Sequence, residues 1–347
     1  MLMLACGLLG LAACQTLDKP AAADEGTLII DVHDGLATKA DTSPIGNDAA
    51  VHDLQLFLFS SDGSLYRREA FEGSSTSRSL DRVKAGTYEI AALVNGPALT
   101  SIQKKQDLLQ SAVALTDNKT DQGFVMYGLT DSPVTITGGA TSAVRADITV
   151  RRLVGRVRLT TVQNGIPASY GALTLSFAFL ENGFGNWTCG ATGDPSGYVN
   201  YAGRKKGRNT STNPSDYIAS ASDADAASLS FQSIGRQVAN GQTLTLNNPF
   251  YTFPNKNRAA DDHFSGPTDQ AACARLVLKA SYGDGGSQSW YYPVTIENLE
   301  RNKTYDVAFI IRGPGSSDPN QKVENGNLTV VVSVDPWGDG GNYTEEF

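Results

Sequence analysis

Short apolar runs of strand length, separated by turn residues, recur along most of the chain and restrict it to a β-rich fold. The runs are dense in β-branched and aromatic residues, which fit a pleated, half-buried surface. The 347-residue sequence contains 35 Gly, and Gly, Pro, Asn and Asp lie between the runs, where they favour turns. Helical spacing of apolar residues is found over residues 102–114. The sequence therefore predicts an all-β fold of β-sandwiches, with one short helix in the first half.

The strand pattern restarts from about Arg156, within the Arg-rich stretch VRRLVGRVRL, and this restart indicates two domains with a boundary near Arg152. Folded domains commonly contain about 100–150 residues, so a chain of 347 residues suits two of them. We expect an N-terminal sandwich over residues 27–152 and a C-terminal sandwich over residues 153–347. We interpret the Arg-rich stretch as the exposed face of a strand. The polar residues 204–228 have no apolar face and predict a long surface loop.

Charge and motif content argue against nucleic-acid binding and catalysis. The formal net charge is −8, with 28 Lys+Arg against 36 Asp+Glu, and no basic stripe is present to neutralise phosphates. The three His residues lack metal-ligand spacing, and no GxSxG, HExxH or phosphate-loop motif occurs. We therefore expect no enzyme activity, no metal and no cofactor.

The first fourteen residues, MLMLACGLLGLAAC, form an apolar run that is too short for a mature membrane-spanning helix. The run ends in LAAC, which resembles the lipobox of bacterial lipoproteins. This pattern predicts a signal peptide over residues 1–13, lipidation of Cys14 and a polar tether over residues 14–26. Acyl chains on Cys14 would hold the protein to a membrane without a transmembrane helix. Gln15, rather than Asp, is compatible with export to the outer membrane.

Two further cysteines, Cys189 and Cys273, remain after removal of the signal peptide and lipidation of Cys14. In an oxidising compartment only one pairing is open to them, a disulfide within the C-terminal sandwich. The alternative is that both are small buried apolar side chains.

The chain ends on a strand-like run, LTVVVSV, at residues 328–334. Pro336 follows and cannot continue a strand ladder, and Trp337 comes next. A β protein that ends this way either completes its own sheet with the last strand or offers that strand to a neighbouring molecule. The four alternate apolar residues of the run are Leu328, Val330, Val332 and Val334.

The order of several segments resembles the fimbrillin family, the pilins of type V pili in Bacteroidia-type bacteria. The N-terminal half carries LFLF with SDG, then AGTYEIAALVNG, then ADITVRRLVGRVRL. The C-terminal half carries FYTFPN, RLVLKASY, WYYPVTI and LERNKTYDVAFIIRGPGSSDP before the last strand and Trp337. Each segment alone is generic β sequence, but their order behind a lipobox is characteristic of the family.

The resemblance implies two transthyretin-like Greek-key β-sandwiches in one subunit. It also implies export as an outer-membrane lipoprotein, removal of the lipidated first strand by a protease, and filling of the groove by a neighbour's C-terminal strand, which is β-augmentation. Other pilin subunits, including anchor and tip subunits, and the processing protease would then be partners, and the mature protein would lie in a surface fimbrium. The ligand of such a fimbrium stays unknown.

Mapped onto this sequence, the removable strand covers residues 27–32, and its apolar and β-branched residues are Thr27, Leu28, Ile29, Ile30 and Val32. The cut is expected in residues 33–50. The family's protease is trypsin-like and often cuts after Arg. This chain departs from the pattern, because no Arg occurs between Cys14 and Arg67. Lys39 is therefore the candidate processing site, and the alternative is a solvated lysine without a role. The donor strand would be residues 328–334, with Trp337 either anchoring its end at an interface or packing in the core.

Three functions follow from these observations. The first is a structural stalk pilin that polymerises by strand exchange and supports adhesion. The second is an anchor subunit that keeps its lipid, which the missing Arg favours. The third is a tip adhesin or glycan-binding surface lipoprotein, for which Trp187, Tyr198 and Tyr201 offer a candidate stacking platform.

Overall fold

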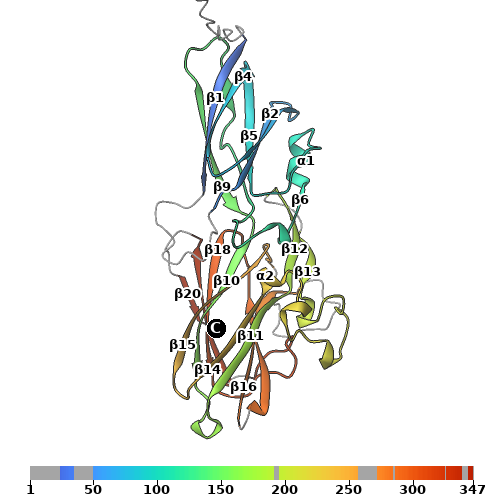
Figure 1. Ribbon diagram of the computed structural model, residues 1–347, viewed down its shortest axis with the longest axis vertical. Coiled ribbons are helices and arrows are strands. Elements are labelled where there is room, and N and C mark those ends of the chain that lie inside the picture. Colours follow the sequence, from blue (N-terminus) through green and yellow to red (C-terminus); the bar gives the residue numbers. More distant parts are fainter. Residues whose placement is uncertain are drawn as a thin grey trace, which may run out of the picture.

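The computed structural model describes residues 24–34, 50–190, 195–256, 272–283, 286–324, 326–337 and 343–346. Strands dominate these residues and form two sandwiches, one above the other along the long axis (Figure 1). The predicted fold class, all-β with two sandwiches, is confirmed.

The N-terminal sandwich is formed by two sheets that share strand β9. One sheet has the order β4–β1–β9, and the other has the order β3–β2–β5–β7, with β8 also paired to β5. The last residues of β9 pair with β7 and connect the two sheets. The bounds are β1 Glu25–Asp34, β2 Asp53–Ser60, β3 Leu65–Glu72, β4 Ser77–Lys84, β5 Gly86–Val94, β7 Met126–Leu129, β8 Val134–Ile136 and β9 Val144–Arg152.

The C-terminal sandwich has two separate sheets, in the orders β15–β10–β18–β19–β20 and β14–β11–β16–β17. Alternate side chains of β10, β11, β16, β18 and β19 meet between the sheets and form its core. The bounds are β10 Gly155–Asn164, β11 Leu173–Glu181, β14 Phe231–Val238, β15 Thr243–Thr252, β16 Ala274–Tyr282, β17 Gln288–Ile296, β18 Lys303–Ile311, β19 Leu328–Pro336 and β20 Tyr343–Glu346.

Both sandwiches begin with an interior strand of the same kind. Strand β1 pairs antiparallel with β4 and parallel with β9. Strand β10 pairs antiparallel with β15 and parallel with β18. The two sandwiches therefore repeat one topology, in which the first strand of the unit is covered on both edges.

A small third sheet and an apolar cluster lie where the two sandwiches meet. In this sheet β6 (Ala112–Ala114) pairs with β12 (Gly183–Thr188), which also pairs with β13 (Ser196–Val199). The junction cluster combines side chains from both halves of the chain. Its buried members are Phe57, Phe59, Ala91, Leu93, Ile102, Leu108, Val113, Leu115, Phe124, Val125, Tyr127, Leu153, Val154, Phe184, Trp187, Cys189, Val199, Leu229, Tyr251, Phe253 and Trp337.

The helix expected over residues 102–114 is shorter than the sequence predicted. Helix α1 spans Lys105–Gln110, and β6 replaces the rest of the expected helix. Val113 lies opposite Trp187 in the small sheet and is fully buried in the junction cluster. Pairing with a strand more than seventy residues away thus overrides the local helical spacing.

The surface loop expected over residues 204–228 is also wrong in part, because it is anchored to the C-terminal sandwich. Tyr217, Ile218 and Ala224 are buried there in a cluster with Phe179 and Phe231. The short helices of the described residues are η1 Leu115–Asp117, η2 Ala168–Tyr170, η3 Tyr201–Gly203, η4 Pro214–Asp216, η5 Ala221–Asp223 and α2 Ala227–Ser230.

Glu181, the last residue of β11, is a fully buried carboxyl group. Its Oε1 lies 3.9 Å from Nη1 of Arg275, and neither carboxyl oxygen has a hydrogen-bond partner among the described residues. Burial raises the pKa of Glu181 from 4.5 to about 8, and the charge of Arg275 only partly opposes this shift. The folded protein therefore favours the protonated, uncharged form of Glu181 near neutral pH.

This buried carboxyl group predicts a loss of stability with rising pH. The folded-state pKa is above the unfolded value, so the folded protein binds more protons between about pH 4.5 and pH 8, and the free energy of unfolding falls as pH rises through that window. In Glu181→Gln this pH-dependent decrease in the free energy of unfolding, on the order of a few kcal/mol, should be absent. Thermal unfolding of both proteins at about pH 5 and about pH 8.5 would measure the difference. An unchanged pH slope in the variant would contradict the prediction.

Candidate functional site

The predicted removable strand lies inside β1, in the interior of the N-terminal sheet. Its backbone pairs with β4 along one edge and with β9 along the other (Figure 1). Strand β1 is also the first described element of the chain. An interior strand at the N-terminal end can be separated covalently from the rest of the sandwich by a single cut downstream.

One face of β1 completes the core of the N-terminal sandwich. Leu28 and Ile30 are fully buried and Val32 is 4% exposed, and they pack among side chains of β2, β5 and β9. Thr27 and Ile29, on the other face, are half-buried. At about 1.5–3 kcal/mol for each large apolar side chain, burial of these three residues stabilises the sandwich by roughly 5–9 kcal/mol. Without β1, a long apolar groove would be open between β4 and β9.

Polar side chains fix the register of β1 from the outer face. The Asp31 carboxylate accepts hydrogen bonds from the Ser77 hydroxyl at 2.5 Å and from Nη1 of Arg145 at 2.8 Å. These two partners hold the pKa of Asp31 below its usual value. Nε2 of His33 lies 3.0 Å from the Asp147 carboxylate. Strand β1 is therefore bound to both neighbouring strands by side chains as well as by backbone.

The predicted donor strand forms β19, which is paired in its own C-terminal sheet. It runs antiparallel to β18, with Val332 opposite Val307. Strand β20 covers part of its other edge. Val332 is 5% exposed, whereas Leu328, Val330 and Val334 are partly buried against the same core. The two-residue spacing of these side chains matches the spacing of Leu28, Ile30 and Val32 on β1.

Trp337 is buried in the junction cluster rather than exposed at a free end. Its ring stacks on Tyr251 at 5.8 Å between centroids and meets the edge of Phe124 at 5.5 Å. The guanidinium carbons of Arg152 and Arg156 each lie 4.7 Å from the ring centroid. Both arginines are at most 2% exposed. The interpretation of the Arg-rich stretch as an exposed strand face is therefore wrong for these two residues, because each guanidinium group packs on an aromatic ring inside the junction.

The remaining predicted site residues are placed as follows. Cys14 and Lys39 lie outside the described residues. Cys189 and Cys273 are both buried, and the structure does not join them by a disulfide. Burial raises the pKa of the Cys189 thiol to about 12.

Membrane-spanning helices and metal-binding clusters are both absent from the described residues. None of the helices in this part of the chain is long and apolar enough to cross a membrane. The same residues contain no group of three or more His, Cys, Asp or Glu side chains arranged to hold a metal ion.

The three aromatic residues proposed as a stacking platform pack against other aromatic rings. Trp187 is 6% exposed and stacks on Phe253, and Tyr198 and Tyr201 contact each other with centroids 5.1 Å apart. Because Trp187 and Tyr201 are buried, the three rings do not form an exposed platform.

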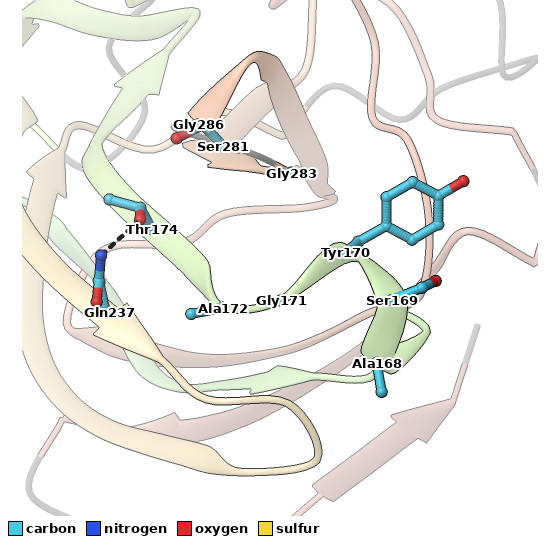
Figure 2. Close-up of a pocket in the computed structure, with 10 residues that line it drawn as sticks. All are labelled: Ala168, Ser169, Tyr170, Gly171, Ala172, Thr174, Gln237, Ser281, Gly283 and Gly286. Carbon is cyan, nitrogen blue, oxygen red and sulfur yellow. Dashed lines mark hydrogen bonds between the residues drawn. The ribbon is translucent and has the colours of Figure 1, made fainter.

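A different aromatic ring, that of Tyr170, is exposed in the connection between β10 and β11. Tyr170 is 44% exposed and borders an open pocket of about 570 Å³ lined by uncharged residues. Figure 2 shows Tyr170 on one side of this pocket and the hydrogen-bonded pair Thr174 and Gln237 on the other. The lining residues are Ala168, Ser169, Tyr170, Gly171, Ala172, Thr174, Gln237, Ser281, Gly283 and Gly286.

Two neighbouring residues of β1 provide a matched test of its packing. Ile30→Ala removes a fully buried side chain and should lower the free energy of unfolding by about 2–5 kcal/mol, through lost burial and a residual cavity. Ile29→Ala, on the outer face, should cost about 1 kcal/mol or less. Chemical denaturation of the full chain measures both. Equal effects at the two positions would contradict the assigned faces of β1.

Comparisons with known proteins agree with this architecture. The family model described as fimbrillin-A associated anchor proteins Mfa1 and Mfa2 matches residues 33–339. No curated protein sequence matches the chain significantly. The family match begins at the end of β1 and spans the described strands from β2 to β19.

Solved structures share the fold across nearly their whole length. A fimbrilin from Porphyromonas gingivalis W83 is 15% identical, with a TM-score of 0.60 over 92% of this chain and 99% of that one. A candidate cell adhesion protein from Bacteroides eggerthii is 18% identical, with a TM-score of 0.58 over 92% and 98%. The tip fimbrial protein Mfa3 from Porphyromonas gingivalis is 13% identical, with a TM-score of 0.50 over 90% and 100%. At these identities the likeness shows the fold, and the family match shows that this chain belongs to the fimbrial protein family described as fimbrillin-A associated anchor proteins Mfa1 and Mfa2.

Proposed function

We propose that this chain is a structural fimbrial subunit that polymerises by exchange of its first strand for the last strand of a neighbour. The observation that carries the proposal is the interior position of β1, whose apolar face fills the N-terminal core. A strand in this position can be replaced only by another strand that supplies backbone pairing on both edges and apolar side chains at alternate residues.

Strand β19 meets both requirements. Leu328, Val330, Val332 and Val334 project from one face at a spacing of two residues, and the strand spans Leu328–Pro336. With about 1.5–3 kcal/mol for each buried side chain, four such residues supply roughly 6–12 kcal/mol before the cost of ordering the strand is subtracted. A polymer joined this way would dissociate slowly.

Processing would start from a lipoprotein held in the outer membrane through Cys14. A trypsin-like protease would then cut after Lys39, in the segment between β1 and β2. Because β1 precedes the other described strands, this one cut leaves it bound to the sandwich by non-covalent contacts alone. Other subunits of the fimbrium would be the partners, and the mature chain would be part of a cell-surface fimbrium.

The proposal predicts that a soluble strand can enter the groove. A chain lacking residues 328–347 should bind a synthetic peptide of residues 328–335 more strongly after cleavage than before it, because both forms can pair the peptide with β18 but only the cleaved form can exchange β1 for it. The same peptide with Val332→Asp should bind at least about tenfold more weakly, because it places an unpaired charge in the core. Fluorescence anisotropy with a labelled peptide measures both.

The full-length chain provides the matching control. Protease treatment should give a ladder of SDS-resistant oligomers, and Lys39→Gln should prevent it. A Lys39→Gln chain that forms the ladder under the same treatment would refute cleavage at Lys39. Equal binding of the peptide to the truncated chain before and after cleavage would refute strand exchange itself.

An anchor subunit is the second candidate function. Two observations favour it: the matching family model is described by anchor proteins, and no Arg occurs between Cys14 and Arg67. An anchor would keep β1 in place and contribute only its last strand. Mass spectrometry of the surface protein separates the candidates, because an anchor keeps an acylated Cys14 and a processed subunit begins after the cut.

A further inference from the structure

Trp337 connects strand β19 to both sandwiches. Phe124 belongs to the segment before β7 in the N-terminal sandwich, and Tyr251 belongs to β15 in the C-terminal sandwich. These two rings are also in contact with each other, with centroids 4.5 Å apart. The Trp337 ring packs against both, so it contributes to the contact between the sandwiches and not to one sandwich alone.

Two buried cations extend this contact to the connection between the sandwiches. Arg152 ends β9, Arg156 lies in β10, and Leu153 and Val154 connect the two strands. Cation–π attraction is strongest for Trp and increases when the pair is removed from water. The ring of Trp337 therefore stabilises the positions of two guanidinium groups that lie on either side of the connecting residues.

The backbone makes the same connection. The Trp337 N–H donates a hydrogen bond to the Asn302 carbonyl oxygen at 2.8 Å, and the Asn302 N–H donates to the Val154 carbonyl oxygen at 2.8 Å. The Leu153 N–H donates to the Val125 carbonyl oxygen at 3.0 Å. A short series of hydrogen bonds thus runs from the end of β19 through the β17–β18 turn to the connecting residues and the N-terminal sandwich.

Strand β19 cannot leave its sheet without moving this residue. Pro336 pairs with Lys303 at the end of the β18–β19 ladder, and Trp337 follows directly. A fully extended chain spans at most about 3.6 Å per residue, so Val334 must stay within about 11 Å of Trp337 as long as the Trp337 ring remains in the junction. Entry of the whole β19 strand into another molecule therefore requires removal of Trp337 from the junction cluster.

We propose that Trp337 is a latch, which couples release of the last strand to loosening of the junction between the two sandwiches. While the latch is in place, β19 is retained in its own sheet and the sandwiches are held together. When β19 is released, the junction loses its Trp ring and the sandwiches become free to reorient. The coupling between β19 and the junction is argued from contacts within one molecule. The role of Trp337 in holding back polymerisation rests in addition on the proposed function.

Amide hydrogen exchange on the uncleaved full-length chain tests the coupling without any polymer. In Trp337→Leu, exchange should accelerate by about tenfold or more at the amides of β19 and, to a similar extent, at Leu153 and Asn302, which report the junction. Trp337→Phe keeps an aromatic ring and should give a smaller increase at both places. Trp290→Leu is the matched control, because Trp290 packs against the C-terminal core. It should leave exchange at Leu153 unchanged.

Acceleration in β19 without acceleration at Leu153 and Asn302 would overturn the proposal, because Trp337 would then hold only the strand. If Trp337→Leu does not fold, Trp337→Phe carries the test, and unchanged exchange at the junction in that variant overturns the latch.

Polymerisation of the protease-treated chains tests the regulatory role separately. Trp337→Phe should form SDS-resistant oligomers several-fold faster than the unsubstituted chain, because the last strand is released more easily. Coupled exchange with equal polymerisation rates would leave the coupling intact and refute the role in holding back assembly. Absence of polymer from both chains would refute the proposed function and leave the exchange result standing.

Discussion

The structure depends on the double pairing of the first strand in each sandwich. A strand that lies between an antiparallel and a parallel neighbour joins the two by backbone hydrogen bonds, and its inward side chains complete the core. Strands β1 and β10 have this position in the two sandwiches. They differ in covalent context, because β10 follows β9 across two residues, whereas β1 is joined to β2 by a single segment of the chain. Under the proposed cut, the same topology would be permanent in the C-terminal sandwich and separable in the N-terminal one.

Local sequence patterns predicted the strands well. A buried strand has apolar side chains at consecutive or alternate residues, and this pattern can be read over a few neighbouring positions. The continuous run LFLF identified β2 as a buried strand, and Phe57 and Phe59 are fully buried. The patterns failed where a distant partner decides the structure. Val113 has helical spacing but pairs with Trp187 in a strand, and the apolar residues Tyr217 and Ile218 anchor a segment whose composition is that of a polar loop.

The role of Trp337 could not be derived from sequence for the same reason. Its ring contacts residues more than 80 positions away, and the two arginines beside it lie in a stretch whose charge indicated solvent exposure. Burial of an arginine is costly unless its charge and hydrogen bonds are compensated. Here Nε of Arg156 donates to the Thr304 hydroxyl at 3.1 Å, and the planar guanidinium packs on the indole ring. The indole ring of Trp337 thus partly compensates the burial of the arginine charge at this site.

Apolar burial and the cut after β1 together would give the proposed exchange its direction. In its own sheet β19 has only Val332 nearly buried, while Leu328, Val330 and Val334 stay partly exposed. In the groove left by β1, the corresponding inward positions are those of Leu28 and Ile30, which are fully buried. Moving partly exposed valines into fully buried positions is favourable by about 25 cal/mol for each Å² of apolar surface removed from water. Displacement of β1 exposes Leu28, Ile30 and Val32 in the same step, so the net gain in burial is the difference between the two strands. The cleaved β1 is no longer linked to the sandwich and would be lost by dilution, so the cut would make the exchange effectively irreversible.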